Sequence, residues 1–310
     1  MTTETFTFVS YDGEEIFTYK WTPDNISIKG VVLIVHGLCE HAGRYADFAA
    51  QLNSFGYAVY AHDQRGHGKT AKTADNLVHI DDGGWISMQR DLVRLIGIVK
   101  DIHPGLPLYL FGHSMGSFIL RNILQNSRTD VKGIILSGTG CFDGLTLNAG
   151  ILLAKSMVGR KGGHKRSYYI NSITFMAFNS KIPNPKTFFD WLSRDEKVIA
   201  NIYSDPLHRI NCSNNLFLEL FKGLKAIHHP ENIKRIPKNI PILLVSGDND
   251  PVGHWGKDVP ELANLYKSIG VKDVRFKLYP GARHEIINEI NKSEVIKDII
   301  DWLDAIAATD

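Results

Sequence analysis

Residues 108–124 read LYLFGHSMGSFILRNIL, with a serine between an apolar run typical of a buried strand and a run typical of a helix. A strand that turns this sharply into a helix leaves no room for side chains two positions before and after the apex, and Gly112 and Gly116 occupy those positions. The same turn directs the amide of Met115 and the start of the helix toward Ser114, which favours negative charge beside it. The stretch therefore predicts that Ser114 is a nucleophile.

Short apolar runs recur on both sides of this serine. Continuous apolar runs, in place of alternating ones, are typical of strands buried on both faces of a mostly parallel sheet. Helical patterns lie between them, so we expect an α/β fold with a central sheet flanked by helices, and an antiparallel hairpin (5–9 with 15–21) at one edge. The apolar runs are 31–35, 58–61, 108–111, 133–136, 241–245 and 274–278, and the helical patterns include 44–55, 85–102, 114–125 and 293–307.

The interval 141–238 departs from this alternation, because it contains no clear strand. Apolar residues recur at helical spacing from Leu216 to Ile227, and another apolar segment covers 151–158. We therefore expect residues 141–238 to form a helical cap, inserted into a core made of residues 1–140 and 239–310. Ligands of open α/β sheets bind beyond the carboxyl ends of the strands, so the cap would cover that site, and its apolar residues favour an apolar ligand.

The composition is that of a globular protein, since 44% of the 310 residues are hydrophobic. A formal net charge of +2 and 22% charged residues provide no field that would select nucleic acid. Cys39, Cys141 and Cys212 form no C-x-x-C pair, which indicates a reducing compartment without a disulfide frame or a zinc cluster. Residues 1–6 lack signal-peptide character, and no apolar run approaches the roughly 18 residues that span a bilayer. We expect a soluble, cytoplasmic protein.

A nucleophilic serine needs a histidine within hydrogen-bond reach, and that histidine needs a carboxylate. For a serine at a strand-to-helix turn the chain order is serine, acid, histidine, which leaves His254 and His284 as candidates. His254 lies in the loop expected to carry the acid. His284 follows an apolar run and a Pro-Gly turn, which would place it at the same sheet edge as Ser114, so we prefer His284.

The acid is expected in the segment SGDNDPV (246–252), which follows an apolar run. Asp250 lies further into the loop and can turn toward the histidine. Asp248 follows Gly247 directly and is more typical of a turn aspartate that accepts hydrogen bonds from local amides. We prefer Asp250 and keep Asp248 as the alternative.

The oxyanion that forms when a serine attacks a carbonyl needs two fixed donors. The amide of Met115 is one of them. The loop after the first central strand, VHGL (35–38), is expected to supply the other, because Gly37 would permit a tight turn that points the amide of Leu38 inward. His36 is expected to hold the shape of this loop.

Taken together, these segments resemble the monoacylglycerol lipase and lysophospholipase group of α/β-hydrolases, over nearly the whole chain. The resemblance extends into the cap interval, at FDWLSRD (189–195) and Asp205-Pro206. The core segments that carry it are HGLCEHAGRY (36–45), DQRGHG (63–68), GHSMG (112–116), SGDND (246–250) and YPGARH (279–284).

The resemblance implies an α/β-hydrolase fold and a carboxylic ester hydrolase that works without a cofactor. It implies Ser114 as nucleophile, Asp250 and His284 as its partners, and Leu38 and Met115 as oxyanion donors. It also implies a helical cap over an acyl tunnel. We expect a lipid-like acyl ester as substrate, monoacylglycerol first and then lysophospholipid or a short-chain ester.

Two other functions stay open at this point. An aminopeptidase or amide hydrolase of the same fold would need an acidic pocket in the cap, for which Glu196 and Glu219 are candidates. A ligand-binding member with little turnover would retain the same residues. The basic stretch 159–166 is expected to be a solvated loop, with contact to an anionic head group or a membrane surface as the alternative. Cys39, beside the oxyanion donor, would make activity sensitive to thiol reagents.

Two motifs are excluded. The segment GHGKT (66–70) lacks the glycine that a phosphate-binding loop requires, because position 63 is Asp63. His36, His41 and the pair His228-His229 have no carboxylate or cysteine at ligand spacing, so we expect no metal.

Overall fold

The computed structural model describes residues 1–127 and 130–308, and the fold is built on an eight-stranded sheet of order β1-β2-β4-β3-β5-β6-β7-β8. The strands from β4 to β8 in this order are parallel, while β1 and β2 form an antiparallel hairpin at one edge. The α/β fold and the edge hairpin are thus as predicted. The strands are β1 (Thr2–Val9), β2 (Glu15–Thr22), β3 (Gly30–Val35), β4 (Tyr57–His62), β5 (Leu108–His113), β6 (Gly133–Ser137), β7 (Ile242–Gly247) and β8 (Val274–Tyr279).

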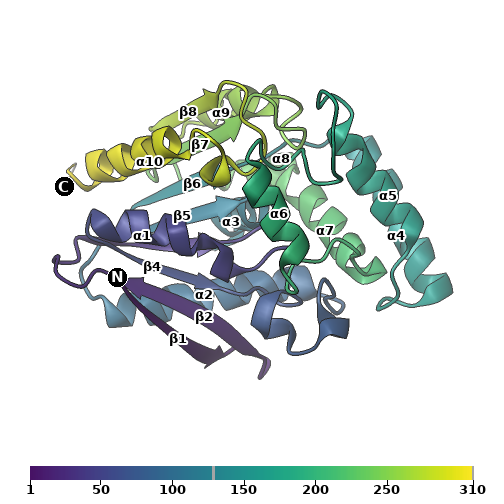
Figure 1. Cartoon of the computed structure of the whole chain (residues 1–310), viewed down its shortest axis with the longest axis horizontal. Coiled ribbons are helices and arrows are strands. Elements are labelled where there is room, and N and C mark those ends of the chain that lie inside the picture. Colours follow the sequence, from purple (N-terminus) through teal and green to yellow (C-terminus); the bar gives the residue numbers. More distant parts are fainter. Residues whose placement is uncertain (128–129, 309–310) are drawn as a thin grey trace.

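Helices cover both faces of the sheet (Figure 1). Alternate residues of β3 pack into two separate cores, Val31, Leu33 and Val35 into one and Val32 and Ile34 into the other, which explains why the strand is apolar throughout. One core contains α1 (Ala46–Ser54) and α10 (Lys292–Ala307), and the other contains α2 (Gly84–Ile102), α3 (Met115–Asn126) and α9 (Asp258–Ser268). Short 3-10 helices lie at Ala42–Tyr45, Gly68–Ala71, Ala74–Asn76, Ala177–Asn179 and Ile286–Asn288.

Between β6 and β7 the described chain is helical and contains no strand. Side chains cap the N-termini of two of these helices. The Asp143 carboxylate accepts a hydrogen bond from the Thr146 amide (2.8 Å), and the Ser213 hydroxyl accepts one from the Leu216 amide (3.1 Å). Figure 1 shows them on the right, beyond the point where β5 turns into α3. They are α4 (Gly144–Lys161), α5 (Tyr168–Met176), α6 (Glu196–Ser204), α7 (Asn214–Ile227) and α8 (Pro230–Ile233).

The basic stretch 159–166 differs from the expected loop. Its first three residues complete α4, and only the segment after Lys161 is irregular. The Arg166 guanidinium donates hydrogen bonds to the backbone oxygens of Asn211, Asp75 and Leu77, each at 2.8 Å. These hydrogen bonds connect the irregular segment to the backbone at residues 75–77 and 211. Within the described residues, no helix combines the length and apolar character that crossing a bilayer requires.

Candidate active site

Ser114 occupies a strained turn between β5 and α3. Its φ is 50°, an unfavourable value for a residue with a side chain. A Cβ on Gly112 would lie 2.7 Å from Leu120 Cδ1, and one on Gly116 would lie 2.0 Å from the Val35 carbonyl oxygen. Both glycines are therefore required by close approach, for the reason expected from the sequence.

The two residues chosen as acid and base lie together. Asp250 follows β7, His284 follows β8, and His284 Nδ1 lies 2.9 Å from each carboxylate oxygen of Asp250. The Ser246 hydroxyl donates to Asp250 Oδ2 (2.8 Å) and the Val252 amide to Oδ1 (2.9 Å), so this buried carboxylate has a full set of donors. With Nδ1 as the donor to Asp250, His284 Nε2 is free to accept a proton.

Ser114 and His284 line the same cavity. No hydrogen bond joins them among the described residues. Bonds of this kind are often long in ligand-free structures and tighten when substrate binds.

The two alternative residues have other partners. His254 is exposed, and its Nδ1 lies 2.7 Å from Asp258 Oδ2. Asp248 Oδ1 accepts a hydrogen bond from the Gly281 amide (2.7 Å), the local role expected of a turn aspartate. Neither residue lines the cavity that contains Ser114.

The pKa values of two neighbouring histidines near Ser114 are shifted in opposite directions. Burial lowers the pKa of His284, but the charge and hydrogen bonds of Asp250, with smaller contributions from Glu285 and Glu40, outweigh it and raise the pKa above its usual value. For His113, whose ring centroid lies 4.7 Å from that of His284, burial lowers the pKa to about 4. His284 is thus the histidine of this pair that is suited to take up a proton.

The loop after β3 brings Leu38 to the cavity beside Met115. His36 is buried and fixes this loop: its Nδ1 lies 2.7 Å from the Gly37 carbonyl oxygen, and its Nε2 accepts from the Gln64 amide (3.0 Å). Gly37 lies in this turn without a left-handed backbone conformation, and the left-handed residue of the loop is Cys39 (φ 70°). Gly37 is needed because a Cβ would lie 2.8 Å from Glu40 Oε1 and 3.2 Å from Ser114 Cβ.

The cavity over Ser114 encloses about 120 Å³ and is mainly apolar. Its few polar walls are His113, His208, Glu40 and Glu285, besides Ser114 and His284. Most of its apolar walls come from the interval between β6 and β7. The apolar walls include Phe118, Phe142, Phe175, Phe178, Phe189, Trp191, Leu192, Ile210, Leu220, Phe221 and Leu224.

Residues 26–291 match the family described as serine aminopeptidase, S33. The chain belongs to this family. The match covers β3 to β8 and therefore includes every residue of the candidate site. As a member of the family it is an α/β-hydrolase, in agreement with the sheet order.

The named activities of similar proteins indicate which class of hydrolase this chain belongs to. This family member is 29% identical to the monoacylglycerol lipase of Mycolicibacterium smegmatis, over 96% of the chain and 95% of the relative, and 28% identical to human monoglyceride lipase, over 97% and 90%. A thermostable carboxyl esterase from Bacillus coagulans, solved in complex with glycerol, superposes with a TM-score of 0.91 at 30% identity, covering 99% of each chain. A soluble variant of Saccharomyces cerevisiae monoglyceride lipase shares the fold (TM-score 0.77, 21% identity, 99% and 96%). This hydrolase is therefore a carboxylic ester hydrolase, a lipase or esterase.

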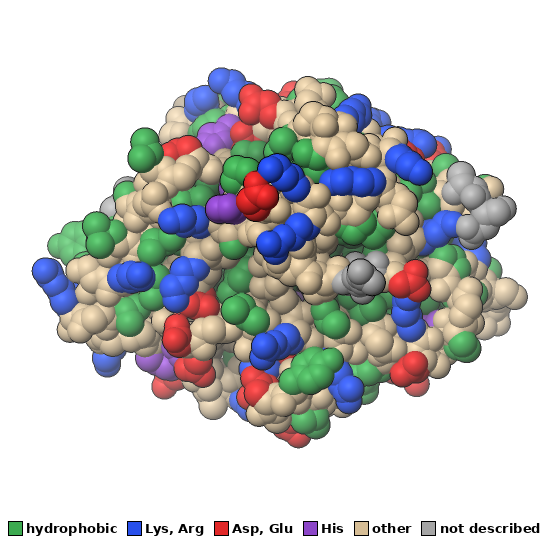
Figure 2. Space-filling model, turned by 180° about the vertical axis from the view of Figure 1, so that it is seen from behind, with side chains coloured by type: hydrophobic (Ala, Val, Ile, Leu, Met, Phe, Trp, Pro, Cys, Tyr) green, Lys and Arg blue, Asp and Glu red, His purple; other side chains and the backbone are tan. Residues whose placement is uncertain are grey.

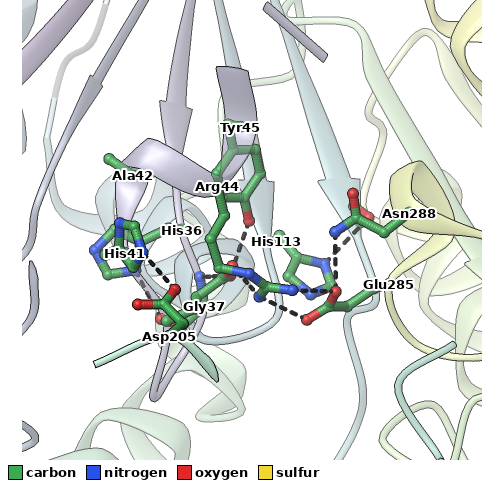
Figure 3. A network of polar contacts seen from close by, with 12 residues as sticks. His36, Gly37, His41, Ala42, Arg44, Tyr45, His113, Asp205, Glu285 and Asn288 are labelled. Atoms are coloured by element: carbon green, nitrogen blue, oxygen red, sulfur yellow. Dashed lines mark hydrogen bonds and ion pairs between the residues drawn. The ribbon is translucent and has the colours of Figure 1, made fainter. Parts of the chain in front are cut away.

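One feature of the site was not predicted. Arg44 donates hydrogen bonds to both Glu40 and Glu285, two residues that line the cavity, and Figure 3 shows Arg44 beside Glu285. The sequence contains a signal for half of it, because Glu40 and Arg44 are four residues apart within HGLCEHAGRY. Nothing in the sequence indicates that Glu285 joins them from the other end of the chain.

The carboxylates considered for an amine-binding pocket lie elsewhere. Glu196 is exposed and pairs with Lys186, and Glu219 pairs with Lys222 (2.6 Å) in a separate groove. Neither lines the cavity over Ser114. Cys39 does line it, with its Sγ 3.4 Å from that of Cys212. No group of three or more potential metal ligands was found within the described part of the chain.

Proposed function

We propose that this hydrolase cleaves lipid-like acyl esters through an acyl-enzyme on Ser114, with monoacylglycerol as the favoured substrate and lysophospholipids or short-chain esters as further ones. The observation that carries the proposal is the His284–Asp250 pair, because His284 lines the same apolar cavity as the strained Ser114. The names of the relatives, monoacylglycerol lipase and monoglyceride lipase, support the choice of substrate.

In the proposed mechanism, Ser114 Oγ attacks the ester carbonyl while His284 Nε2 takes its proton. The backbone amides of Leu38 and Met115 stabilise the oxyanion. The imidazolium, stabilised by the ionised Asp250, then gives its proton to the departing alcohol. Water attacks the acyl-enzyme in the same way and releases the fatty acid. Burial would raise the pKa of Asp250, but His284 and the hydrogen-bond donors lower it below its usual value, in keeping with a carboxylate that stays charged.

We propose that residues 141–238 act as a cap over this site, on a core formed by residues 1–140 and 239–310. Most apolar walls of the cavity belong to the cap interval, which supports a role in substrate choice. Exposed Leu145 and Leu152 lie on the same helix as Arg160 and Lys161, and Figure 2 shows hydrophobic and basic side chains close together at this end of the molecule, on its left. Transient contact with a membrane surface is therefore part of the proposal. A cytoplasmic location is also part of it, supported by the three free cysteines.

Ester hydrolysis is favoured over amide hydrolysis by the charges at the cavity. A substrate amine would need a carboxylate without a cationic partner. The carboxylates that line the cavity, Glu40 and Glu285, are both paired with Arg44, at 2.9 Å and 2.7 Å.

The test compares Ser114→Ala with wild type and with Ser268→Ala, an exposed serine of α9. We expect both variants to fold, and Ser114→Ala to lose nearly all hydrolysis of a 4-nitrophenyl ester and of monoacylglycerols. Turnover by Ser114→Ala at the wild-type rate would refute the assignment of Ser114 as the nucleophile. Faster cleavage of aminoacyl anilides than of acyl esters by the wild-type protein would instead favour the hypothesis of an aminopeptidase or amide hydrolase.

A further inference from the structure

Three charged side chains form a compact cluster beside the cavity: Glu40 and Arg44 lie four positions apart, and Glu285 joins them from a distant part of the chain. Arg44 donates to Glu285 through both terminal nitrogens (2.8 Å and 2.7 Å) and to Glu40 through one of them (2.9 Å). The Arg44 side chain is 12% exposed and each carboxylate only 5%. Figure 3 shows Arg44 reaching across to Glu285, with Asn288 on the far side of that carboxylate.

Each carboxylate is attached to a different part of the proposed active site. Glu40 accepts hydrogen bonds from the Gly37 amide and the Tyr45 hydroxyl, so it holds the turn that presents the amide of Leu38. Glu285 directly follows His284, and its amide donates to the Leu192 carbonyl (2.7 Å). Arg44 is thus the bridge between the loop of the oxyanion donor and the loop of the proposed base.

We propose that the Glu40–Arg44–Glu285 cluster is a positioning device, which keeps the amide of Leu38 and the imidazole of His284 in register with Ser114 while charge develops in the transition state. The inference rests on the function proposed above. None of the three side chains needs to touch the reacting atoms. A displacement of either loop by about 1 Å can lower the rate by a factor of about 100.

The chemistry of the cluster suits this role. A bidentate pair between guanidinium and carboxylate fixes both distance and angle, which an ammonium group cannot do. Burial would raise the pKa of Glu285, but the charge and hydrogen bonds of Arg44 lower it to about 2, so the carboxylate is ionised over the working range of an esterase. A cluster with two negative charges and one positive charge also leaves a negative field at His284, which favours the imidazolium.

A cluster of the same kind elsewhere in the chain serves as the matched control. Arg65 also joins two carboxylates, Asp91 through its Nε (2.6 Å) and Asp12 through its terminal nitrogens (2.7 Å and 2.8 Å). None of these three residues lines the cavity over Ser114. Arg65→Lys therefore removes the same kind of geometry without changing a residue that lines the cavity.

The experiment measures kcat, KM and the inhibition constant of an alkyl trifluoromethyl ketone, which forms a tetrahedral oxyanion adduct with a serine nucleophile. We expect Arg44→Lys to lower kcat by a factor of about 10 to 100 and to raise the inhibition constant by a similar factor, with little change in KM. Arg65→Lys should change neither value by more than about twofold, at a comparable loss of thermal stability.

Glu285→Gln is the second variant, because it retains the shape of the side chain and its capacity to hydrogen-bond. The charged and titratable groups facing His284 are Asp250, Glu285, Glu40 and His113. Removal of one negative charge lowers the pKa of His284, so the acid limb of kcat/KM should move to lower pH while the variant stays folded.

Equal values of kcat and of the inhibition constant in Arg44→Lys and Arg65→Lys, or an acid limb that Glu285→Gln does not move, would overturn the proposal. Labelling of Ser114 by a fluorophosphonate in the wild-type protein distinguishes a failure of the proposed function from a failure of the positioning role. If Ser114 is not labelled, the proposed function fails. If Ser114 is labelled and the Arg44 variant behaves like the control, only the positioning role fails.

Discussion

The Nδ1 atom of His284 lies 2.9 Å from both carboxylate oxygens of Asp250, although the two residues are 34 positions apart in the chain. Both side chains are buried, and Ser246 and Val252 hold the carboxylate from its other side. This geometry fixes the tautomer of His284 and leaves Nε2 directed away from the acid.

Asp250→Asn should lower kcat for ester hydrolysis by a factor of about 10⁴, because an amide favours the wrong tautomer of the histidine. The matched control is Asp248→Asn, which removes a charge but keeps an oxygen that can accept from the Gly281 amide, and should retain activity within about tenfold. Steady-state kinetics on a 4-nitrophenyl ester measures both. A larger loss in Asp248→Asn would make Asp248 the acid.

The pH dependence of kcat/KM should reflect His284. The base must be neutral to accept a proton, so activity falls as the pH drops through its pKa. That pKa is raised above its usual value of about 6.5, because Asp250 and the neighbouring carboxylates outweigh burial. We expect the midpoint of the acid limb above pH 6.5 in a profile recorded at constant ionic strength. A midpoint below that value would contradict the assignment.

Gly116→Ala should destabilise the fold strongly, since its Cβ would lie 2.0 Å from the Val35 carbonyl oxygen. The expected loss is at least the roughly 1 to 3 kcal/mol typical of overpacking, because backbone cannot move aside as a side chain can. Gly97→Ala is the control: Gly97 is exposed within α2 and has no atom within 4 Å of an added Cβ. That variant should gain about 0.5 to 1 kcal/mol. Urea unfolding measures the free energy of unfolding of both variants. Equal values for the two variants would refute the close approach between position 116 and the Val35 carbonyl oxygen.

Phe221→Ala tests whether the apolar cavity binds the acyl chain. Phe221 lines the cavity from α7, and its ring is not fully buried, so the variant should fold. We expect kcat/KM for a medium-chain ester to fall about tenfold, the effect of losing 1 to 2 kcal/mol of apolar contact, while an acetyl ester changes less than about threefold. Phe55→Ala, on an exposed phenylalanine remote from the cavity, should leave both unchanged. An equal loss for both esters would contradict an acyl-binding role.

The sequence allowed the sheet and the candidate triad to be predicted because their signals are local. Strands buried on both faces are apolar throughout, as β3 and β5 are, and a serine between glycines marks one specific turn. The helix α9 (Asp258–Ser268) was not among the predicted helices. Pro260 lies at its third position, where a helix tolerates proline, but within a sequence the same residue equally marks a break.

The features that escaped prediction depend on tertiary contacts. The pairing of Arg44 with Glu285 joins residues 241 positions apart, and charged residues at such a distance carry no mutual signal. The turn at Gly37 was expected, but the contacts with Glu40 and Ser114 that exclude a Cβ there arise only in the folded chain. The interval between β6 and β7 contributes in the same way, because the centroid of the Trp191 ring lies 5.1 Å from that of His284, a contact that exists only in the folded chain.

The most direct test of the central claim is the mass of the intact protein during turnover. Wild type mixed with a 4-nitrophenyl acyl ester and quenched in acid within milliseconds should carry one acyl group, and peptide mapping should assign it to Ser114. The adduct should be absent from Ser114→Ala. An acyl group on another residue, or full hydrolytic turnover by Ser114→Ala, would contradict the acyl-enzyme on Ser114.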